Sequence, residues 1–128
     1  MKLLLDTHTL IWWFDGSPLL SKKALQALSD EDNAVFVSAV SAWEISIKER
    51  AGKLAVSRDL LEDFDVTIAS QNFETLPVST KHAFQGGRFL ARHKDPFDRL
   101  LAAQALVEGL TLVSGDQKMP EFGVPLLW

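Results

Sequence analysis

Residues 3–13 of the chain, Leu3-Leu4-Leu5-Asp6-Thr7-His8-Thr9-Leu10-Ile11-Trp12-Trp13, decide the fold. Three leucines before an aspartate predict a short strand over residues 2–5 that is buried on both faces. A helical turn is expected over residues 9–14, and Asp15-Gly16-Ser17-Pro18 ends it. A buried strand that leads directly into a helix is typical of a parallel sheet covered by helices.

The rest of the chain continues this alternation. Further strands are predicted over residues 34–37, 73–78, 110–113 and 124–127; helices are predicted over residues 22–28 after a Ser21 cap, 40–51 before Gly52, 59–70, 79–84 and 96–108 before Gly109. The clearest boundary is Asp95-Pro96, because Asp accepts hydrogen bonds from free amides at a helix start and Pro has no N–H to leave unpaired there. The short, apolar strands predict an α/β fold with a parallel sheet covered on both faces.

Composition bounds the class of protein. With 128 residues, 47% of them hydrophobic, and no sign of a linker, we expect one domain over residues 1–128. The absence of cysteine excludes thiolate metal sites and thiol nucleophiles and is compatible with the reducing cytoplasm, which is the expected location. Asp6 interrupts the N-terminal apolar run, and no run approaches the roughly 20 apolar residues that a membrane span needs.

The net charge of −4 is unusual for a protein that binds nucleic acid. With four of the 17 acidic residues assigned to a metal, however, the other 13 would balance the 13 basic residues. Bound divalent cations would also reverse the sign of the site. The charge therefore argues only weakly against an RNA substrate.

Four acidic residues share one kind of position: Asp6 and Asp116 follow strands, and Glu44 and Asp98 lie early in helices. In a parallel sheet these positions meet at the carboxyl edge, where ligands bind. Crowded carboxylates repel one another, so a hard cation is their natural occupant. One or two Mg²⁺ or Mn²⁺ ions would lower the pKa of a bound water and stabilise charge on a phosphodiester under attack.

Each acid also has a structural alternative. Asp6 is suited to cap the next helix, and Glu44 completes a capping box with Ser41. Asp98 suits the positive end of its helix, and Asp116 suits a turn. Asp95 is interpreted first as a helix cap and second as a metal ligand.

Other side chains have predicted supporting roles. Thr7 could orient a metal-bound water, or else shape the turn. Lys48, Arg92, Lys94 and Arg99 are candidate RNA-phosphate contacts, with solvated helix faces as the alternative and an acidic partner as a second option for Arg99. The four tryptophans are expected in the core or in interfaces, with stacking on an unpaired base as the alternative.

Four segments carry most of these residues. They are Asp6-Thr7-His8-Thr9-Leu10-Ile11-Trp12-Trp13, Ser41-Ala42-Trp43-Glu44-Ile45, Asp95-Pro96-Phe97-Asp98-Arg99-Leu100-Leu101-Ala102-Ala103-Gln104-Ala105 and Leu112-Val113-Ser114-Gly115-Asp116. In this order and at this spacing they resemble the PIN-domain family, specifically its VapC-type toxins, over almost the whole chain. Ser114 stands where many members have Thr, and it keeps a hydroxyl for a water or metal contact.

The resemblance implies a three-layer α/β/α sandwich with a short central parallel sheet. It implies Mg²⁺ or Mn²⁺ bound by the acids at positions 6, 44, 98 and 116, endoribonuclease activity, a homodimer or a heteromer with a cognate antitoxin, and inhibition by that antitoxin. The expected function is therefore a metal-dependent ribonuclease, the toxin of a toxin-antitoxin pair. The alternative is a catalytically silent module of the same fold that binds RNA or blocks translation by occupancy.

Overall fold

Strand β1 (Lys2–Leu5) lies in the middle of a five-stranded sheet whose order is β3-β2-β1-β4-β5. The structure is a computed structural model that describes residues 1–128. The other strands are β2 (Ala34–Ser38), β3 (Glu74–Leu76), β4 (Thr111–Val113) and β5 (Leu126–Leu127). All neighbouring strands pair in parallel, which confirms the predicted parallel sheet.

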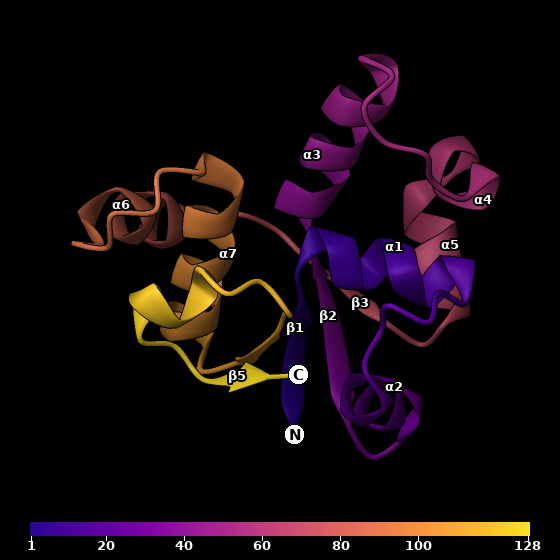
Figure 1. Ribbon diagram of the computed structural model, residues 1–128, viewed down its shortest axis with the longest axis horizontal. Helices are drawn as coiled ribbons and strands as arrows, with labels where there is room; N and C mark the ends of the chain where they lie inside the picture. The colour runs from indigo at the N-terminus through magenta and orange to yellow at the C-terminus, as the bar shows by residue number, and fades with distance from the viewer.

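Helices cover both faces of this sheet (Figure 1). They are α1 (Thr7–Asp15), α2 (Lys22–Ser29), α3 (Ala39–Arg50), α4 (Arg58–Glu62), α5 (Phe64–Ser70), α6 (Thr80–Arg88) and α7 (Pro96–Glu108), with a 3₁₀ turn, η1, over Met119–Phe122. Helices α6 and α7 lie on one side of the strands, and α1, α2, α4 and α5 lie on the other. The predicted three-layer α/β/α arrangement is confirmed.

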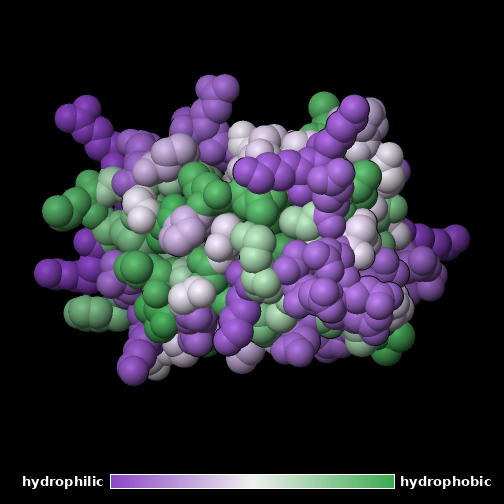
Figure 2. Space-filling view, turned by 90° about the horizontal axis from the view of Figure 1, so that it is seen from below, coloured by the Kyte–Doolittle hydropathy of each residue, from purple (hydrophilic) through white to green (hydrophobic).

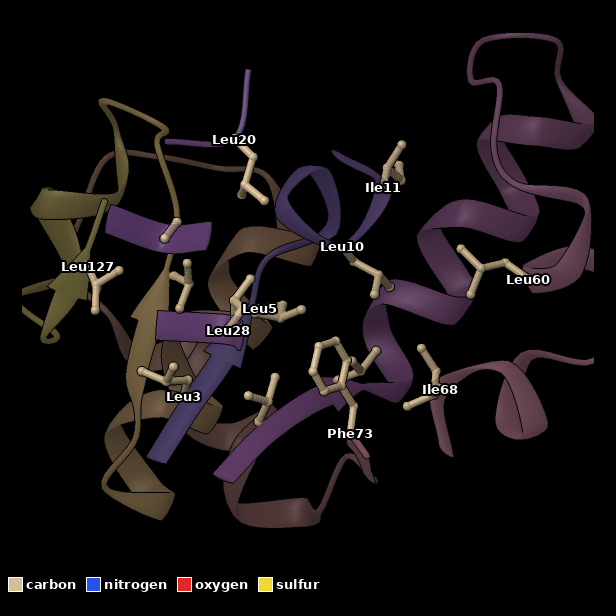
Figure 3. Packing of buried hydrophobic residues seen from close by; sticks show 14 of the residues in the cluster. Leu3, Leu5, Leu10, Ile11, Leu20, Leu28, Leu60, Ile68, Phe73 and Leu127 are labelled. Atoms are coloured by element: carbon tan, nitrogen blue, oxygen red, sulfur yellow. The ribbon is translucent and has the colours of Figure 1, made fainter. Parts of the chain in front are cut away.

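Two hydrophobic cores fill the spaces between the layers, and β1 contributes to both. Leu3 and Leu5 belong to the core that contains Leu10 of α1, whereas Leu4 faces the core that contains Leu101 of α7. All five side chains are fully buried. Figure 3 shows the first core, in which side chains from β1, α1 and α2 point toward one another. The unbroken run of leucines follows from burial on both faces, because successive strand residues point in opposite directions.

Local capping signals set several helix boundaries as predicted. The Asp95 carboxylate accepts hydrogen bonds from the amides of Phe97 (2.9 Å) and Asp98 (3.3 Å), and α7 ends at Gly109 in the left-handed conformation (φ 66°). Ser21 caps α2 in the same way through the amide of Ala24. Side chains that satisfy free amides at a helix start commonly stabilise it by about 1 kcal/mol.

The structure corrects two predicted helices. Helix α1 begins at Thr7 instead of residue 9, because the Asp6 carboxylate caps it through the amide of Thr9 at 2.8 Å. The single helix predicted over residues 59–70 is in fact α4 and α5. The chain is extended at Asp63 (φ −153°), whose carboxylate caps α5 through the amide of Val66.

Smaller corrections concern element lengths. Helix α6 continues beyond residue 84 through Gly86 and Gly87, where the Arg99 side chain donates a hydrogen bond to the Gly86 carbonyl at 2.8 Å and so satisfies the end of the helix. Strands β3 and β5 are shorter than the predicted 73–78 and 124–127, because only residues 74–76 pair with β2 and only residues 126–127 pair with β4.

The surface differs between the two sides of the sheet. Figure 2 views the molecule from below Figure 1; hydrophobic residues gather on the left of that face, the side of α6 and α7, and hydrophilic residues dominate the right. The exposed hydrophobic residues of α6, α7 and the segment between them include Phe84, Leu90 and Val107. No helix combines the length and apolar character needed to cross a membrane.

Candidate functional site

The carboxyl edge of the sheet gathers the acidic residues. Asp6 follows β1 directly, Asp116 lies in the loop after β4, and α3, which carries Glu44, begins where β2 ends. Asp98 lies in the first turn of α7. The parallel topology therefore brings residues from four distant parts of the sequence to one edge, as the sequence predicts.

Asp6 is one of the two buried acids of this edge, with 6% of its surface exposed; Glu44 is the other, with 4%. Besides capping α1, its carboxylate accepts a hydrogen bond from the Ser114 hydroxyl. Burial nevertheless raises the pKa of Asp6, because the hydrogen bonds from Ser114 and Thr9 offset only part of the desolvation. No ion pair of the structure involves Asp6. The helix cap is thus real, but it leaves a buried carboxylate without a cation.

Asp98 lies against a histidine. Nε2 of His93 is 2.7 Å from Oδ2 of Asp98, and both side chains are largely buried. Burial raises the pKa of Asp98 to about 6; the nearby charges of Asp95 and Asp116 also raise it, and the hydrogen bond from His93 opposes the shift. The nearness of three carboxylates makes the charged form of Asp98 costly in the absence of a cation.

His93, Asp98 and Asp116 form the tightest cluster at the edge. Each offers one ligand atom, and these atoms lie within 4.8 Å of one another. Asp116 itself is exposed, and its Oδ1 accepts a hydrogen bond from the amide of Lys118, so the predicted turn role is present. Its own amide donates to the Ser114 hydroxyl at 3.1 Å. Ser114 therefore connects Asp116 to Asp6.

Glu44 is buried in the second turn of α3 and pairs with the ammonium of Lys48. The alternative of a capping box formed by Ser41 and Glu44 is wrong. Helix α3 is capped by Ser38, whose hydroxyl accepts from the amide of Val40 at 2.9 Å. Ser41 instead accepts a hydrogen bond from Thr7 at 3.1 Å, which ties α1 to α3 below the acidic edge.

Lys48 links Glu44 to the rest of the edge. Its pKa is raised, chiefly by the hydrogen bond to Glu44 and further by the charges of Asp95 and Asp98. Nζ of Lys48 also lies 5.5 Å from the centre of the Phe97 ring. Asp6 and Glu44 are outside the tight group of three, but hydrogen bonds and charge join both to it.

The donor set fits a hard divalent cation. Carboxylate oxygens dominate it, the buried Asp6 carboxylate lacks a cationic partner, and the charges around Asp98 are unbalanced. Such sites suit Mg²⁺ and Mn²⁺, and an imidazole nitrogen is also an acceptable ligand for several transition metals.

The sequence model of the PIN domain family matches residues 3–125. The chain belongs to this family. Ribonuclease VapC22 of Mycobacterium tuberculosis (strain ATCC 25618 / H37Rv) is 28% identical to this PIN domain over 123 residues, covering 91% of the chain and 88% of the relative.

Solved structures show the same fold. VapBC2 from Rickettsia felis, bound to a DNA fragment from its promoter, has a chain with a TM-score of 0.70 and 18% identity, covering 99% of this PIN domain and 98% of that chain. DNA-bound VapBC from Salmonella typhimurium has a chain with a TM-score of 0.68 and 21% identity, covering 99% and 97% of the two chains.

The basic residues of this PIN domain divide into two groups. Arg92 and Lys94 are exposed in the segment that leads into α7, where they remain candidates for phosphate contacts. Arg99 has another role, which corrects its predicted RNA contact: its guanidinium donates to the carbonyls of Gly86, Phe89, Ala91 and His93. Lys48 is engaged with Glu44.

Sequence reasoning does not predict a place for His93 in the acidic cluster. The segment between α6 and α7 has no regular structure, so no periodicity shows where its side chains point. The signal present is proximity in sequence, because His93 precedes the capping residue Asp95 by two positions. A histidine so close to a helix start can reach an acid in the first turn.

Proposed function

We propose that this PIN domain is a metal-dependent endoribonuclease that hydrolyses RNA phosphodiester bonds and acts as the toxin of a toxin-antitoxin pair. The observation that carries the proposal is the cluster of His93, Asp98 and Asp116, which Ser114 connects to the buried Asp6. The 28% identical relative named a ribonuclease supports the same activity.

The metal would be held by Asp6, Asp98 and Asp116, with Glu44 as a fourth carboxylate. When bound, Mg²⁺ or Mn²⁺ supplies charge stabilisation at the phosphodiester and acidifies a water that becomes the nucleophile. The protein prepares this site in advance, since the helix cap and the Ser114 hydroxyl fix the orientation of the Asp6 carboxylate. The Ser114 hydroxyl also accepts a hydrogen bond from the amide of Asp116, so it fixes the positions of Asp6 and Asp116 relative to each other.

The basic side chains suggest how substrate approaches. Exposed Arg92 and Lys94 lie close in sequence to His93 and Asp98, where they would contact RNA phosphates and offset the acidic edge. Lys48 places a positive charge beside Glu44 and within the field of Asp98. The Thr7 hydroxyl, which donates to Ser41, is expected to help order water next to Asp6.

The proposed partner is a cognate antitoxin protein that inhibits the nuclease, in a heteromer or bound to a homodimer. Several solved structures with the same fold are VapBC assemblies, including the two described above in complex with DNA. Their similarity supports an antitoxin partner for this chain as a proposal.

Cleavage by the purified protein, free of any partner, tests the function. Single-stranded RNA should be cut in the presence of Mg²⁺ or Mn²⁺, and EDTA should stop the reaction. Asp6→Asn and Asp98→Asn should abolish cleavage and, on expression, toxicity. The matched control is Lys118→Gln, which changes an exposed side chain in the loop that carries Asp116 and should stay active.

Two results would contradict the catalytic assignment. Undiminished cleavage by both Asn variants would show that the acids are not needed. RNA binding with metal but without cleavage, together with translational arrest by both variants, would favour the silent, occupancy-based module instead.

A further inference from the structure

Three aromatic side chains lie in a row beside the acidic edge. The rings of His8 and Trp12 are 5.7 Å apart with a tilt of 46°, and those of Trp12 and Trp128 are 5.8 Å apart with a tilt of 52°. His8 and Trp12 are four residues apart on α1 and therefore share one face of that helix. Trp128 follows β5 directly.

Backbone contacts join this row to the candidate metal site. Leu127 pairs with Val113, and the amide of Ser114 donates to the Leu127 carbonyl at 3.2 Å, so Trp128 lies at the carboxyl edge of the sheet. The Trp128 indole lies directly against Gly115. A Cβ atom added there would be only 2.5 Å from Cε2 of the indole.

The position of Gly115 matters because its two neighbours belong to the site. Ser114 hydrogen-bonds to Asp6, and Asp116 is part of the tight cluster with His93 and Asp98. A group that stacks on the Trp128 indole would therefore lie close to the phosphate that is proposed to react at this site.

Two side chains of the row are exposed to solvent, and the third packs against the hydrophobic core. His8 is exposed and Trp128 is 36% exposed, whereas Trp12 is partly buried and packs against the first core. Contacts with Trp12 and Gly115 thus restrict the motion of the Trp128 indole, while part of Trp128 stays exposed. A rigid aromatic surface loses little conformational entropy when it binds a flat partner.

We propose that Trp128 and Trp12, with His8 at the end of the row, form a stacking platform for an unpaired RNA base next to the scissile phosphate. The proposal rests on the ribonuclease function and narrows its substrate to RNA that is single-stranded at the cleavage site. A nucleobase suits this surface because it is flat and uncharged, so it can lie beside carboxylates that repel a phosphate. Stacking also tolerates any base, because every base has an aromatic face.

The test measures coupling between Trp128 and one substrate base. A series of short single-stranded RNA oligonucleotides carries one abasic nucleotide at successive positions around the cleavage site, and kcat/KM is measured for each with Mn²⁺. For the wild-type protein, removal of the stacked base should lower kcat/KM on the order of tenfold. Trp128→Leu should lower kcat/KM on intact RNA by a similar factor and should no longer respond to that abasic position.

Matched variants separate stacking from general damage. Trp128→Phe keeps an aromatic face and should retain the response to the abasic position. Phe84→Leu changes an aromatic residue on α6 that is more exposed (72%) and lies outside the row, and it should behave as wild type. Trp12→Leu, which also removes an aromatic face, gives a second, independent measurement if Trp128→Leu does not fold.

The outcomes are distinguishable. If wild-type protein cleaves RNA but Trp128→Leu and Trp12→Leu keep its full sensitivity to abasic positions, the platform is refuted while the nuclease stands. If these variants instead alter sedimentation of the protein and leave cleavage unchanged, the row is a contact between subunits and the platform is refuted. If wild-type protein cleaves no RNA, the proposed function fails and the platform fails with it.

Discussion

Nε2 of His93 lies 2.7 Å from Oδ2 of Asp98 at the edge of the acidic cluster. Arg99 holds the histidine in place, because its guanidinium binds the carbonyls of His93 and Ala91 from the neighbouring position on α7. A carboxylate that coordinates a metal is usually oriented by such a partner, and a nearby imidazole also offers a nitrogen ligand. The pair is therefore expected to influence both the strength and the choice of metal binding.

Replacement of the histidine should weaken the site. We expect His93→Asn to lower Mn²⁺ affinity by about 10- to 100-fold, the usual effect of removing a residue that orients a metal ligand. Isothermal titration calorimetry measures this without RNA. His8→Asn, which changes an exposed histidine outside the cluster, should leave the affinity unchanged. Unaltered Mn²⁺ binding by His93→Asn would show that the pair has no part in the metal site.

Metal affinity should depend on pH through Asp98. The pKa of this carboxyl is raised to about 6, so protons compete with the metal below that pH. Since ionisation is required for coordination, the apparent Kd for Mg²⁺ should be about tenfold weaker at pH 5 than at pH 7. Titrations at half-unit intervals test this expectation. A flat profile over that range would contradict it.

Asp98→Asn should stabilise the protein when metal is absent. The folded-state pKa of Asp98 is above its ordinary value of 3.8, so folding favours the protonated form, and stability falls as the pH rises from about 4 to about 6. At pH 7.5 in EDTA the variant should gain about 1 kcal/mol, a value reduced for solvent screening, and at pH 4 the gain should vanish.

Saturating Mg²⁺ should reverse that order. Wild-type protein gains stability by binding the ion, whereas Asp98→Asn has lost a ligand. Thermal melts with and without Mg²⁺ provide the comparison. If Mg²⁺ raised the Tm of both proteins equally, Asp98 would not belong to the metal site.

Arg99→Lys should loosen the segment between α6 and α7. A lysine cannot reproduce a planar guanidinium bonded to four carbonyls, so a loss of about 2 kcal/mol or more is expected. Urea unfolding measures the loss, and hydrogen exchange should accelerate in residues 89–95. Arg92→Lys, an exposed change in the same segment, is the control. Equal rates of hydrogen exchange in both variants would contradict a role for the Arg99 guanidinium in holding this segment.

The parts of the fold that could be predicted are those that depend on residues close together in the sequence. Asp95, Pro96 and Gly109 fix both ends of α7 by capping, and the leucines of β1 indicate burial on both faces. The division at Asp63 was missed because one capping side chain inside an apolar pattern does not outweigh helical periodicity.

The site was predictable to the extent that it follows from topology. Asp6 and Asp116 follow parallel strands, so their approach could be inferred without coordinates. The roles of His93 and Arg99 depend on the path of an irregular segment, which composition and spacing do not reveal. Arg99 had the chemistry of a phosphate ligand, and only the carbonyls around it show that its donors are already used.

Strand β1 has one further consequence for how the molecule loses its structure. Because Leu4 supports one core while Leu3 and Leu5 support the other, neither layer of helices can melt and leave its opposite layer intact. Heating should therefore give a single calorimetric transition, with equal calorimetric and van't Hoff enthalpies. Asp6 is the next residue after this strand, so unfolding of the strand would also remove Asp6 from the carboxyl edge of the sheet.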